Sequence, residues 1–255
     1  KGLTKKVIIG DYIAVNFIDR IFDNPMMFTG FENLMALYGY SLQVYADFSG
    51  YTDIAIGIAL LMGFTLPKNF DSPYKAKNVG EFWKRWHISL SGWLKDYLYI
   101  PLGGNRGGSV GTWIALIFIS AFIIMLSGKM IVLYGFIWAA LLITFLAIWV
   151  KPFRTWLTTN INLLITMLLG GLWHGASWQF VIWGGLNGLG LIVYKLWRKI
   201  SPYEKYDNAI GIVVKVFVTF NFITFTRIWF RAENMESTWQ IINQIGTSFN
   251  ASLIP

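Results

Sequence analysis

The amino-acid sequence predicts an all-α, polytopic membrane protein with about six spanning helices and additional interfacial or re-entrant helices. Of the 255 residues, 55% are hydrophobic and only 13% are charged, whereas an ordinary soluble domain carries about 25% charged residues. The charged residues form short clusters between long apolar runs. This distribution excludes a water-soluble globule and is typical of a membrane protein with basic cytoplasmic loops.

The net charge of +8 is consistent with the same class of protein. A nucleic-acid-binding domain needs a basic face on a polar folded surface. The basic residues here are confined to the segments between apolar runs, so no nucleic-acid partner is expected. The chain has no cysteine, which excludes disulfides, cysteine nucleophiles and Cys-ligated metal sites. The first apolar run lacks a small-residue cleavage site and carries several charges, so it is not predicted to be a signal peptide.

Six apolar runs are long enough to cross a bilayer, for which about 20 residues are needed. The first run contains Asp47 and Asp53. Because carboxylates are disfavoured in lipid, we expect this helix to be tilted or broken. The six predicted spans are residues 34–64, 110–127, 131–150, 157–173, 178–196 and 211–229.

Three further segments, residues 5–23, 79–100 and 236–248, are predicted to be helical but too polar or too short to cross the membrane. In 79–100, Asn78 and Glu81 suit a helix start, and Pro101 ends the run. Its apolar side chains recur at three- and four-residue spacing and share one face. Tryptophan and tyrosine favour the membrane–water boundary, so we expect this helix to lie in the interface or to dip into the protein. The face consists of Phe82, Trp86, Leu90, Trp93, Leu94 and Tyr97.

The basic residues determine the predicted orientation. Lysines and arginines cluster between the first and second spans, and the positive-inside rule places this region in the cytoplasm. Counting crossings from there places the turn that contains His174 outside, and the basic clusters at 151–154 and 195–205 inside. The cluster that sets this orientation comprises Lys68, Lys75, Lys77, Lys84, Arg85, Lys95 and Arg106.

The sequence contains two histidines, His87 and His174. His174 lies between two apolar spans and is flanked by Gly170, Gly171 and Gly175, which leave room for a substrate beside the imidazole. An ionisable group near the membrane interior is costly and usually functional, and an imidazole takes up and releases a proton near neutral pH. We therefore interpret His174 as a general base. The alternative is a structural histidine whose ring binds backbone carbonyls at a helix end.

The other candidate polar residues allow two interpretations each. His87 follows Arg85 and Trp86, and the alternative for it is an interfacial histidine without a chemical role. Two histidines without an acidic cluster make a poor metal site, so no metal is expected. Asp47 and Asp53, six residues apart, lie on different faces of a helix. We favour the interpretation that each pairs with a buried lysine, arginine or hydroxyl over a direct role in catalysis.

Arg227 and Arg231 bracket the end of the last predicted span. Their predicted role is to anchor that helix, and the alternative is to bind a phosphate or a carboxylate. The glycine-rich run at 184–190 permits close packing of helices. No strand precedes this run, so a nucleotide-binding loop is discarded.

Four segments together resemble the membrane-bound O-acyltransferase (MBOAT) family, and most closely its bacterial alginate O-acetyltransferase branch. Residues 82–106 (FWKRWHISLSGWLKDYLYIPLGGNR) and 171–188 (GLWHGASWQFVIWGGLNG) are similar to two long histidine signatures of the family. Residues 47–53 (DFSGYTD) and 230–233 (FRAE) are shorter matches. The resemblance covers nearly the whole chain. It implies a single membrane-embedded acyltransferase domain, residues 1–255, that is the C-terminal part of a longer chain.

The resemblance also implies roles for individual residues. His174 corresponds to the catalytic histidine and His87 to the second polar residue of the active site, so the two side chains are expected to converge. His87 would orient the donor or stabilise the developing oxyanion by hydrogen bonding. Asn187 stands where histidine is common in this branch, so it is expected not to be essential. Residues with a supporting role in the site are expected among Asp47, Asp53, Arg85, Trp86 and Trp173.

The implied chemistry is acyl transfer, with acetyl as the expected acyl group and no permanently bound cofactor. The donor would be a thioester of coenzyme A or of the phosphopantetheine arm of a carrier protein, reaching the site from the cytoplasm. The acceptor hydroxyl would come from the opposite side and belong to the modification of an exported polysaccharide such as alginate. The implied location is the bacterial cytoplasmic (inner) membrane, in multi-pass form. Membrane lipids and periplasmic or extracellular acetyl-transfer proteins are the expected partners.

Three other functions remain open at this point. D-alanyl transfer to teichoic acid, a related MBOAT activity, is disfavoured by the run at 101–106 (PLGGNR). A transporter or channel would use Asp47, Asp53 and His174 to line a polar path, but no convincing internal repeat is present. A membrane subunit that only scaffolds a secretion or polymer-modification complex would explain the hydrophobicity but not the two histidine signatures.

Overall fold

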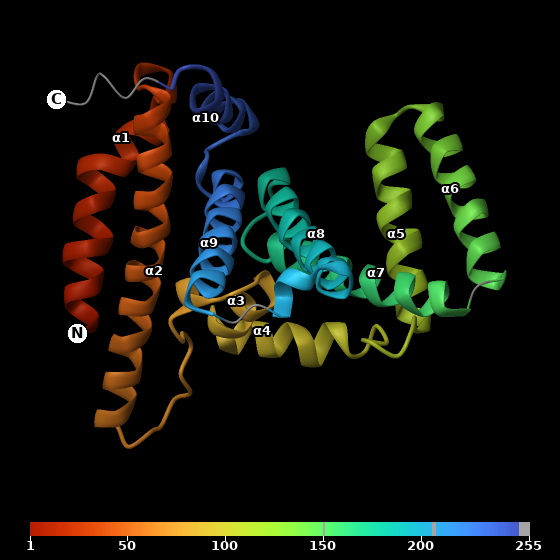
Figure 1. Cartoon of the computed structure of the whole chain (residues 1–255), viewed down its shortest axis with the longest axis horizontal. Coiled ribbons are helices and arrows are strands. Elements are labelled where there is room, and N and C mark those ends of the chain that lie inside the picture. The colour runs from red at the N-terminus through yellow and green to blue at the C-terminus, as the bar shows by residue number, and fades with distance from the viewer. Residues whose placement is uncertain (150, 206–207, 250–255) are drawn as a thin grey trace.

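The computed structural model describes residues 1–149, 151–205 and 208–249, and the regular secondary structure of these residues is entirely helical. Figure 1 shows the helices in chain order, from the N-terminal segment beside α2 to α10. The all-α fold class predicted from the sequence is confirmed. The long helices are α2 (Gly30–Leu61), α5 (Val110–Ser127), α6 (Met130–Trp149), α7 (Lys151–Leu172), α8 (Trp178–Ile200) and α9 (Ala209–Arg231).

Shorter helical elements connect these long helices. The N-terminal segment winds through the wide turns of η1 (Thr4–Asp11) and η2 (Ala14–Ile18) into α1 (Asp19–Asp23). The connection from α2 to α5 contains α3 (Val79–Arg85) and α4 (Ile88–Leu94), and α10 (Met235–Thr247) follows α9. The remaining single turns are η3 (Pro25–Met27), η4 (Pro73–Lys75), η5 (Lys95–Tyr99) and η6 (Pro202–Lys205).

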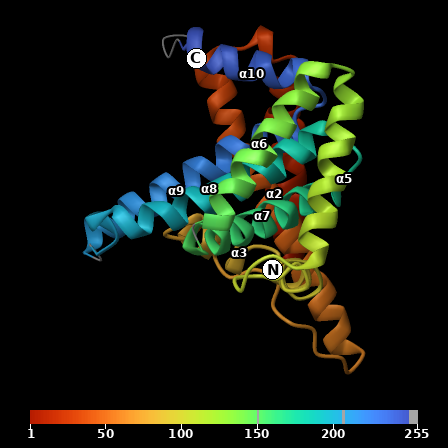
Figure 2. The ribbon, with the colours of Figure 1, turned by 90° about the vertical axis from the view of Figure 1, so that its right-hand side faces the viewer.

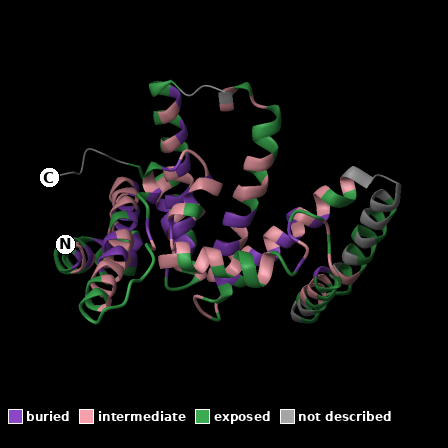
Figure 3. Cartoon of the chain, turned by 90° about the horizontal axis from the view of Figure 1, so that it is seen from below, coloured by how far each residue is buried: buried purple, intermediate pink, exposed green. Residues whose placement is uncertain are grey.

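Each of the six predicted spans falls on one long helix. By length and composition, α2, α8, α9 and residues Phe153–Leu172 of α7 are able to cross a membrane. The apolar part of α5, Val110–Met125, is shorter, and α6 covers the predicted span 131–150 except residue 150, which lies outside the described residues. In Figure 2 the α5–α6 hairpin stands toward the viewer. In Figure 3 it lies at the right and is mostly exposed where it is coloured, as expected of lipid-facing helices.

Helix α2 is continuous, so of the two expected alternatives, a tilted or a broken helix, the break is wrong. Its 32 residues extend about 48 Å at about 1.5 Å per residue, which exceeds the roughly 30 Å hydrocarbon core of a bilayer. Lys5 Nζ lies 2.8 Å from Asp53 Oδ2, and Lys6 forms an ion pair with Asp47. The N-terminal segment therefore neutralises both carboxylates from alongside, and the helix does not need to be interrupted.

The predicted single helix 79–100 is instead divided at Trp86 and His87, which corrects the sequence-based expectation. Trp86 is extended, and His87 has left-handed backbone angles with φ at 47°. Asn69 holds the new helix start, because its backbone oxygen accepts from Ile88 N at 2.9 Å and its side chain accepts from Ser89 N at 3.1 Å. This second helix start is supplied by a residue outside the segment, so local periodicity did not predict it.

Two buried clusters define the core. One lies where the N-terminal segment, α2, α8, α9 and α10 meet, and includes Leu37, Trp183 and Ile228. The other lies beneath α3 and includes Phe82 and Trp86. Buried positions accordingly gather at the left and centre of Figure 3. The space between the two clusters holds the candidate site.

Helices α7 and α8 form a closely packed hairpin. A Cβ atom at Gly171 would lie 2.2 Å from the Phe180 carbonyl oxygen, and one at Gly184 would lie 2.3 Å from that of Met167. Only glycine permits this approach, because real Cβ atoms do not come so close to a backbone oxygen. The hairpin thereby fixes the position of the turn that carries His174.

Candidate active site

A small cavity of about 60 Å³ lies between α2, α3, α8 and α9. Its polar lining comprises both histidines together with Arg227 and Asn187, and the remainder is mostly aromatic. The two histidines are 87 positions apart in the chain, so the predicted convergence of His87 and His174 is confirmed. The full lining is Val44, Phe48, Phe82, Trp83, Trp86, His87, His174, Trp183, Asn187, Ile223, Arg227 and Phe230.

His174 lies in the turn between α7 and α8, where its backbone N–H donates to Gly171 O at 2.9 Å. Its ring meets Trp183 and Phe230 edge to face, with centroids 5.2 and 5.0 Å away. Burial, with a smaller contribution from His87, lowers the pKa of His174 to about 4. Among the described residues, no group hydrogen-bonds to either ring nitrogen, so the alternative of a ring held by backbone carbonyls is wrong. The neutral imidazole is therefore able to accept a proton.

His87 lies at the junction of α3 and α4 and approaches the same cavity from another side. Its left-handed backbone is a conformation that residues other than glycine rarely adopt. The His87 ring meets Phe48 edge to face at 4.7 Å, and its Nδ1 lies 3.4 Å from Ser89 Oγ. Burial lowers the pKa of His87 below its ordinary value. Trp173 contacts both imidazoles, with centroids 6.1 Å from His87 and 5.0 Å from His174.

A second cavity, of about 250 Å³, lies on the other side of His174. It shares Trp83, His174 and Trp183 with the first cavity. Its walls come from α3, α4, η5, α7 and α8, and they carry Lys84 and Lys95. Both lysines belong to the basic cluster that is predicted to face the cytoplasm. The imidazole of His174 is thus placed where the two cavities meet.

Two buried polar atoms on the lining have no partner among the described residues. The Asn187 side-chain nitrogen donates to Trp183 O at 2.9 Å and to Thr226 Oγ1 at 3.3 Å. Because a carbonyl can only accept, this contact fixes the amide orientation and leaves Asn187 Oδ1 unpaired. The indole N–H of Trp83 is also unpaired. Buried polar groups are normally satisfied, and such atoms around a cavity are typical of a ligand site.

The other residues predicted to support the site fall in different places. Trp86 lines the first cavity, and Trp173 contacts both histidines. Asp47 and Asp53 form the ion pairs with Lys6 and Lys5 described above. These pairs agree with the interpretation that both carboxylates stabilise helix packing, and neither carboxylate lines the cavity with the histidines.

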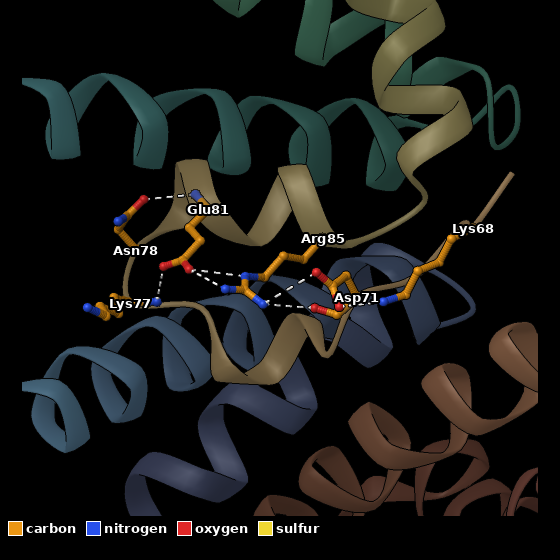
Figure 4. A network of polar contacts seen from close by, with 6 residues as sticks. All are labelled: Lys68, Asp71, Lys77, Asn78, Glu81 and Arg85. Carbon is orange, nitrogen blue, oxygen red and sulfur yellow. Dashed lines mark hydrogen bonds and ion pairs between the residues drawn. The ribbon is translucent and has the colours of Figure 1, made fainter.

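Arg85 lies outside both cavities, at the end of α3, in a polar network that runs along this helix (Figure 4). Its guanidinium contacts Glu81 Oε1 at 2.7 and 3.0 Å and donates to Asp71 O at 3.1 Å. Asp71 in turn pairs with Lys68 at 2.6 Å, and Asn78 Oδ1 accepts from Glu81 N at 2.8 Å. This network holds the loop before α3 against the helix. The position of Arg85 is therefore structural.

Sequence reasoning did not assign Trp83, Asn187, Phe230 or Arg227 to the site. Arg227 stands near the end of a span, a position where an anchoring role is the usual interpretation. The glycine-rich run around Asn187 suggested close packing, and the resemblance suggested that Asn187 itself is not essential. The signal that could have identified both is their polar character on helices that are otherwise apolar, because such residues normally face a cavity or a partner.

The model of the membrane-bound O-acyltransferase family matches residues 11–122, a range that includes His87 and ends before His174. The peptidoglycan O-acetyltransferase of Helicobacter pylori is 37% identical over 241 residues, which cover 94% of this chain and 36% of that protein. The probable alginate O-acetylase of Pseudomonas aeruginosa is 36% identical, with the same coverage of 94% and 36%.

A more distant relative is named for a different activity. The teichoic acid D-alanyltransferase of Bacillus subtilis is 28% identical over 229 residues, which cover 88% of this chain and 47% of that protein. The chain thus spans between about a third and about half of the length of these curated relatives.

Proposed function

Because the chain belongs to the membrane-bound O-acyltransferase family, we propose that it forms the catalytic centre of a multi-pass membrane enzyme that transfers an acetyl group from a thioester to a hydroxyl. The observation that carries this proposal is the meeting of His87 and His174 in one cavity. The proposed location is the bacterial cytoplasmic membrane, and the proposed end product is an acetyl ester on an exported polysaccharide.

The two cavities suggest how the substrates reach the histidines. The larger cavity has largely apolar walls with Lys84 and Lys95 on its lining. It suits the pantetheine arm of coenzyme A or of a carrier protein, with the lysines near the phosphate end of the donor. The smaller cavity, which contains both histidines, would receive the thioester and the acceptor hydroxyl. The acceptor would be a sugar or a small carrier group on the outer side, passed on by extracytoplasmic partner proteins.

In the proposed reaction, His174 acts as the general base. Its neutral imidazole takes the proton of the acceptor hydroxyl while the hydroxyl oxygen attacks the thioester carbonyl carbon. When the resulting tetrahedral intermediate collapses, the carbon–sulfur bond breaks and the imidazolium returns the proton to the leaving thiolate. The products are an ester and a free thiol. No acyl-enzyme is required, in keeping with a chain that has no cysteine.

Acetyl is favoured over D-alanyl for two reasons. The O-acetyltransferase relatives are 36–37% identical, whereas the D-alanyltransferase is 28% identical. In addition, the lining carries the cation Arg227, and among the described residues no carboxylate pairs with it. The ammonium group of a D-alanyl thioester would be repelled there, whereas a neutral acetyl group would not.

The test compares cells that make the full protein, cells that lack it, and cells that make His174→Gln or His87→Gln. Acetyl esters on the exported polysaccharides, released by mild alkali, are measured in each. We expect esters only with the unsubstituted protein, with each variant present in membranes at the normal level. Normal ester content with His174→Gln at full abundance would contradict the proposed role of the general base.

A further inference from the structure

Arg227 is a buried cation whose charge has no counterion in the described part of the chain. Arg227 is 5% exposed and lines the cavity that contains both histidines. One guanidinium nitrogen, Nη1, donates to Tyr74 Oη at 2.5 Å and to Ser41 O at 3.4 Å. The guanidinium also lies 4.8 Å from the centre of the Trp86 ring. The other guanidinium nitrogens, Nε and Nη2, make no hydrogen bond to any described residue. Their N–H groups are therefore available as donors.

The contacts of Arg227 orient the guanidinium without neutralising it. The Tyr74 hydroxyl is the only acidic group that bonds to it among the described residues. Burial raises the pKa of Tyr74, although Arg227 acts in the opposite direction, so Tyr74 is a neutral phenol at physiological pH. The rings of Trp86 and Tyr74 stabilise a cation only weakly. A guanidinium buried in this way is costly unless negative charge appears near it.

We propose that Arg227 is a catalytic residue that binds the carbonyl oxygen of the thioester and stabilises the negative charge that develops on it. This inference rests on the proposed acyl transfer. As the hydroxyl oxygen bonds to the carbonyl carbon, the C=O electron pair moves to the carbonyl oxygen, and the hydroxyl proton moves to His174. Arg227 donates to the resulting oxyanion through the N–H groups of Nε and Nη2. The pair then returns to re-form C=O, the carbon–sulfur bond breaks, and the thiolate takes the proton from the imidazolium.

The surroundings favour a single developing charge over a bound phosphate or carboxylate. The described lining of the cavity contains one permanent cation, and most of the rest is aromatic. A phosphate normally requires several donors or cations, whereas one oxyanion is satisfied by one or two donors held in a water-poor site. The cavity of about 60 Å³ also suits the small acyl end of a donor better than a hydrated anion. Tyr74 acts as a positioning residue, because its hydroxyl fixes the guanidinium.

The experiment uses membranes that contain the full protein, with radiolabelled acetyl-coenzyme A in one arm and acetyl-loaded acyl carrier protein in the other. Ester formation gives kcat and the donor KM for Arg227→Gln and Tyr74→Phe. Loss of one oxyanion donor lowers kcat by about 100- to 1,000-fold, so we expect this for Arg227→Gln, with the donor KM unchanged. Tyr74→Phe should lower kcat by roughly tenfold or more through misplacement of the guanidinium.

Two control variants change a tyrosine and an arginine that lie outside the cavity. Tyr38→Phe removes a hydroxyl that donates to Asn221 and so also joins α2 to α9. Arg231→Lys alters the neighbouring arginine, which pairs with Asp19 at 2.6 Å. Both should leave kcat and the donor KM unchanged. Arg227→Lys should retain part of kcat, because it keeps the charge but loses the fork geometry.

The outcomes separate this inference from the proposed function. An unchanged kcat for Arg227→Gln at normal abundance overturns the role of Arg227. If that variant does not accumulate, Tyr74→Phe decides: a lower kcat at unchanged KM supports the role, and an unchanged kcat overturns it. If the unsubstituted protein transfers no acetyl group, or if His174→Gln is fully active, the proposed function itself fails. Active unsubstituted protein, inactive His174→Gln and fully active Arg227→Gln overturn only the inference about Arg227.

Discussion

The ring of His174 meets the ring of Trp183 edge to face, with 5.2 Å between their centroids and 90° between their planes. The rings of Trp173, Phe180 and Phe230 also contact it, and burial lowers the pKa of His174 to about 4. The protonated imidazolium is the form that burial disfavours, so the ring is neutral at pH 7 and becomes protonated only as the pH falls toward the lowered pKa. A general base is active in its neutral form, and this determines the sign of the pH dependence.

We therefore expect kcat/KM for acetyl transfer to hold constant well below pH 6.5, the usual pKa of imidazole, and to fall only in more acidic solution. The other ionisable groups that line this cavity are His87 and Arg227. Burial lowers the pKa of His87 as well. The measurement is a pH–rate profile at low donor concentration, with His174→Gln as the control. A fall in kcat/KM that begins at or above pH 6.5 would contradict the interpretation of His174 as a buried base that is neutral at pH 7.

Asn187 provides a test of the charge balance in the cavity. Asn187→Asp keeps the shape of the side chain but places a carboxyl group on the lining next to Arg227 and His174. An ionised carboxylate would offset the charge of Arg227 and raise the pKa of His174, because an opposite charge favours the protonated imidazole. We expect kcat to fall at least tenfold at pH 7, about 1.4 kcal/mol in the barrier, while protein abundance stays normal. Unchanged activity would mean that the cavity tolerates a negative charge.

The glycines of the α7–α8 hairpin give a prediction about stability. A Cβ at Gly184 would lie 2.3 Å from Met167 O, so Gly184→Ala should force the two helices apart and displace His174. Overpacking of this kind costs about 1–3 kcal/mol. We expect a lower thermal midpoint of the purified protein and reduced acetyl transfer. Gly185→Ala is the matched control, because its Cβ would meet only a Leu168 methyl group at 3.4 Å; equal effects of both variants would argue against the packing interpretation.

For Arg85 we expect a small effect on stability and no effect on acetyl transfer. Its contacts with Glu81 and Asp71 lie outside the cavities (Figure 4), and partly exposed ion pairs contribute about 0.2–1 kcal/mol. Arg85→Ala should therefore lower the thermal midpoint slightly and leave kcat for acetyl transfer unchanged. A large fall in kcat with no change in thermal stability would indicate that Arg85 acts on the substrates.

The sequence was sufficient for the long helices and for the two histidines. The predicted spans depended on long apolar runs, which any helix in lipid must have. The convergence of His87 and His174 followed from the two signatures. The division between α3 and α4 was not predictable, because Asn69, outside the periodic segment, provides the second helix start. The continuity of α2 likewise depends on Lys5, supplied by the preceding segment.

Arg227 shows why part of the candidate site was missed. In the sequence it is a basic residue close to the end of an apolar run, and anchoring at the interface is the usual role of such a residue. Its position on the cavity depends on Tyr74 and Ser41, which lie 153 and 186 positions earlier in the chain. A contact between residues so distant along the chain has no periodic signature in a single sequence.

The pair of cavities that meet at His174 has a consequence for fidelity. Trp83 and Trp183 stand beside the imidazole where the two spaces join, so the walls at this junction are mainly apolar. Under the proposed function, a thioester donor that binds before the acceptor sugar finds no hydroxyl nucleophile in the cavity. The thioester of such a donor would then be protected from hydrolysis until the acceptor hydroxyl binds.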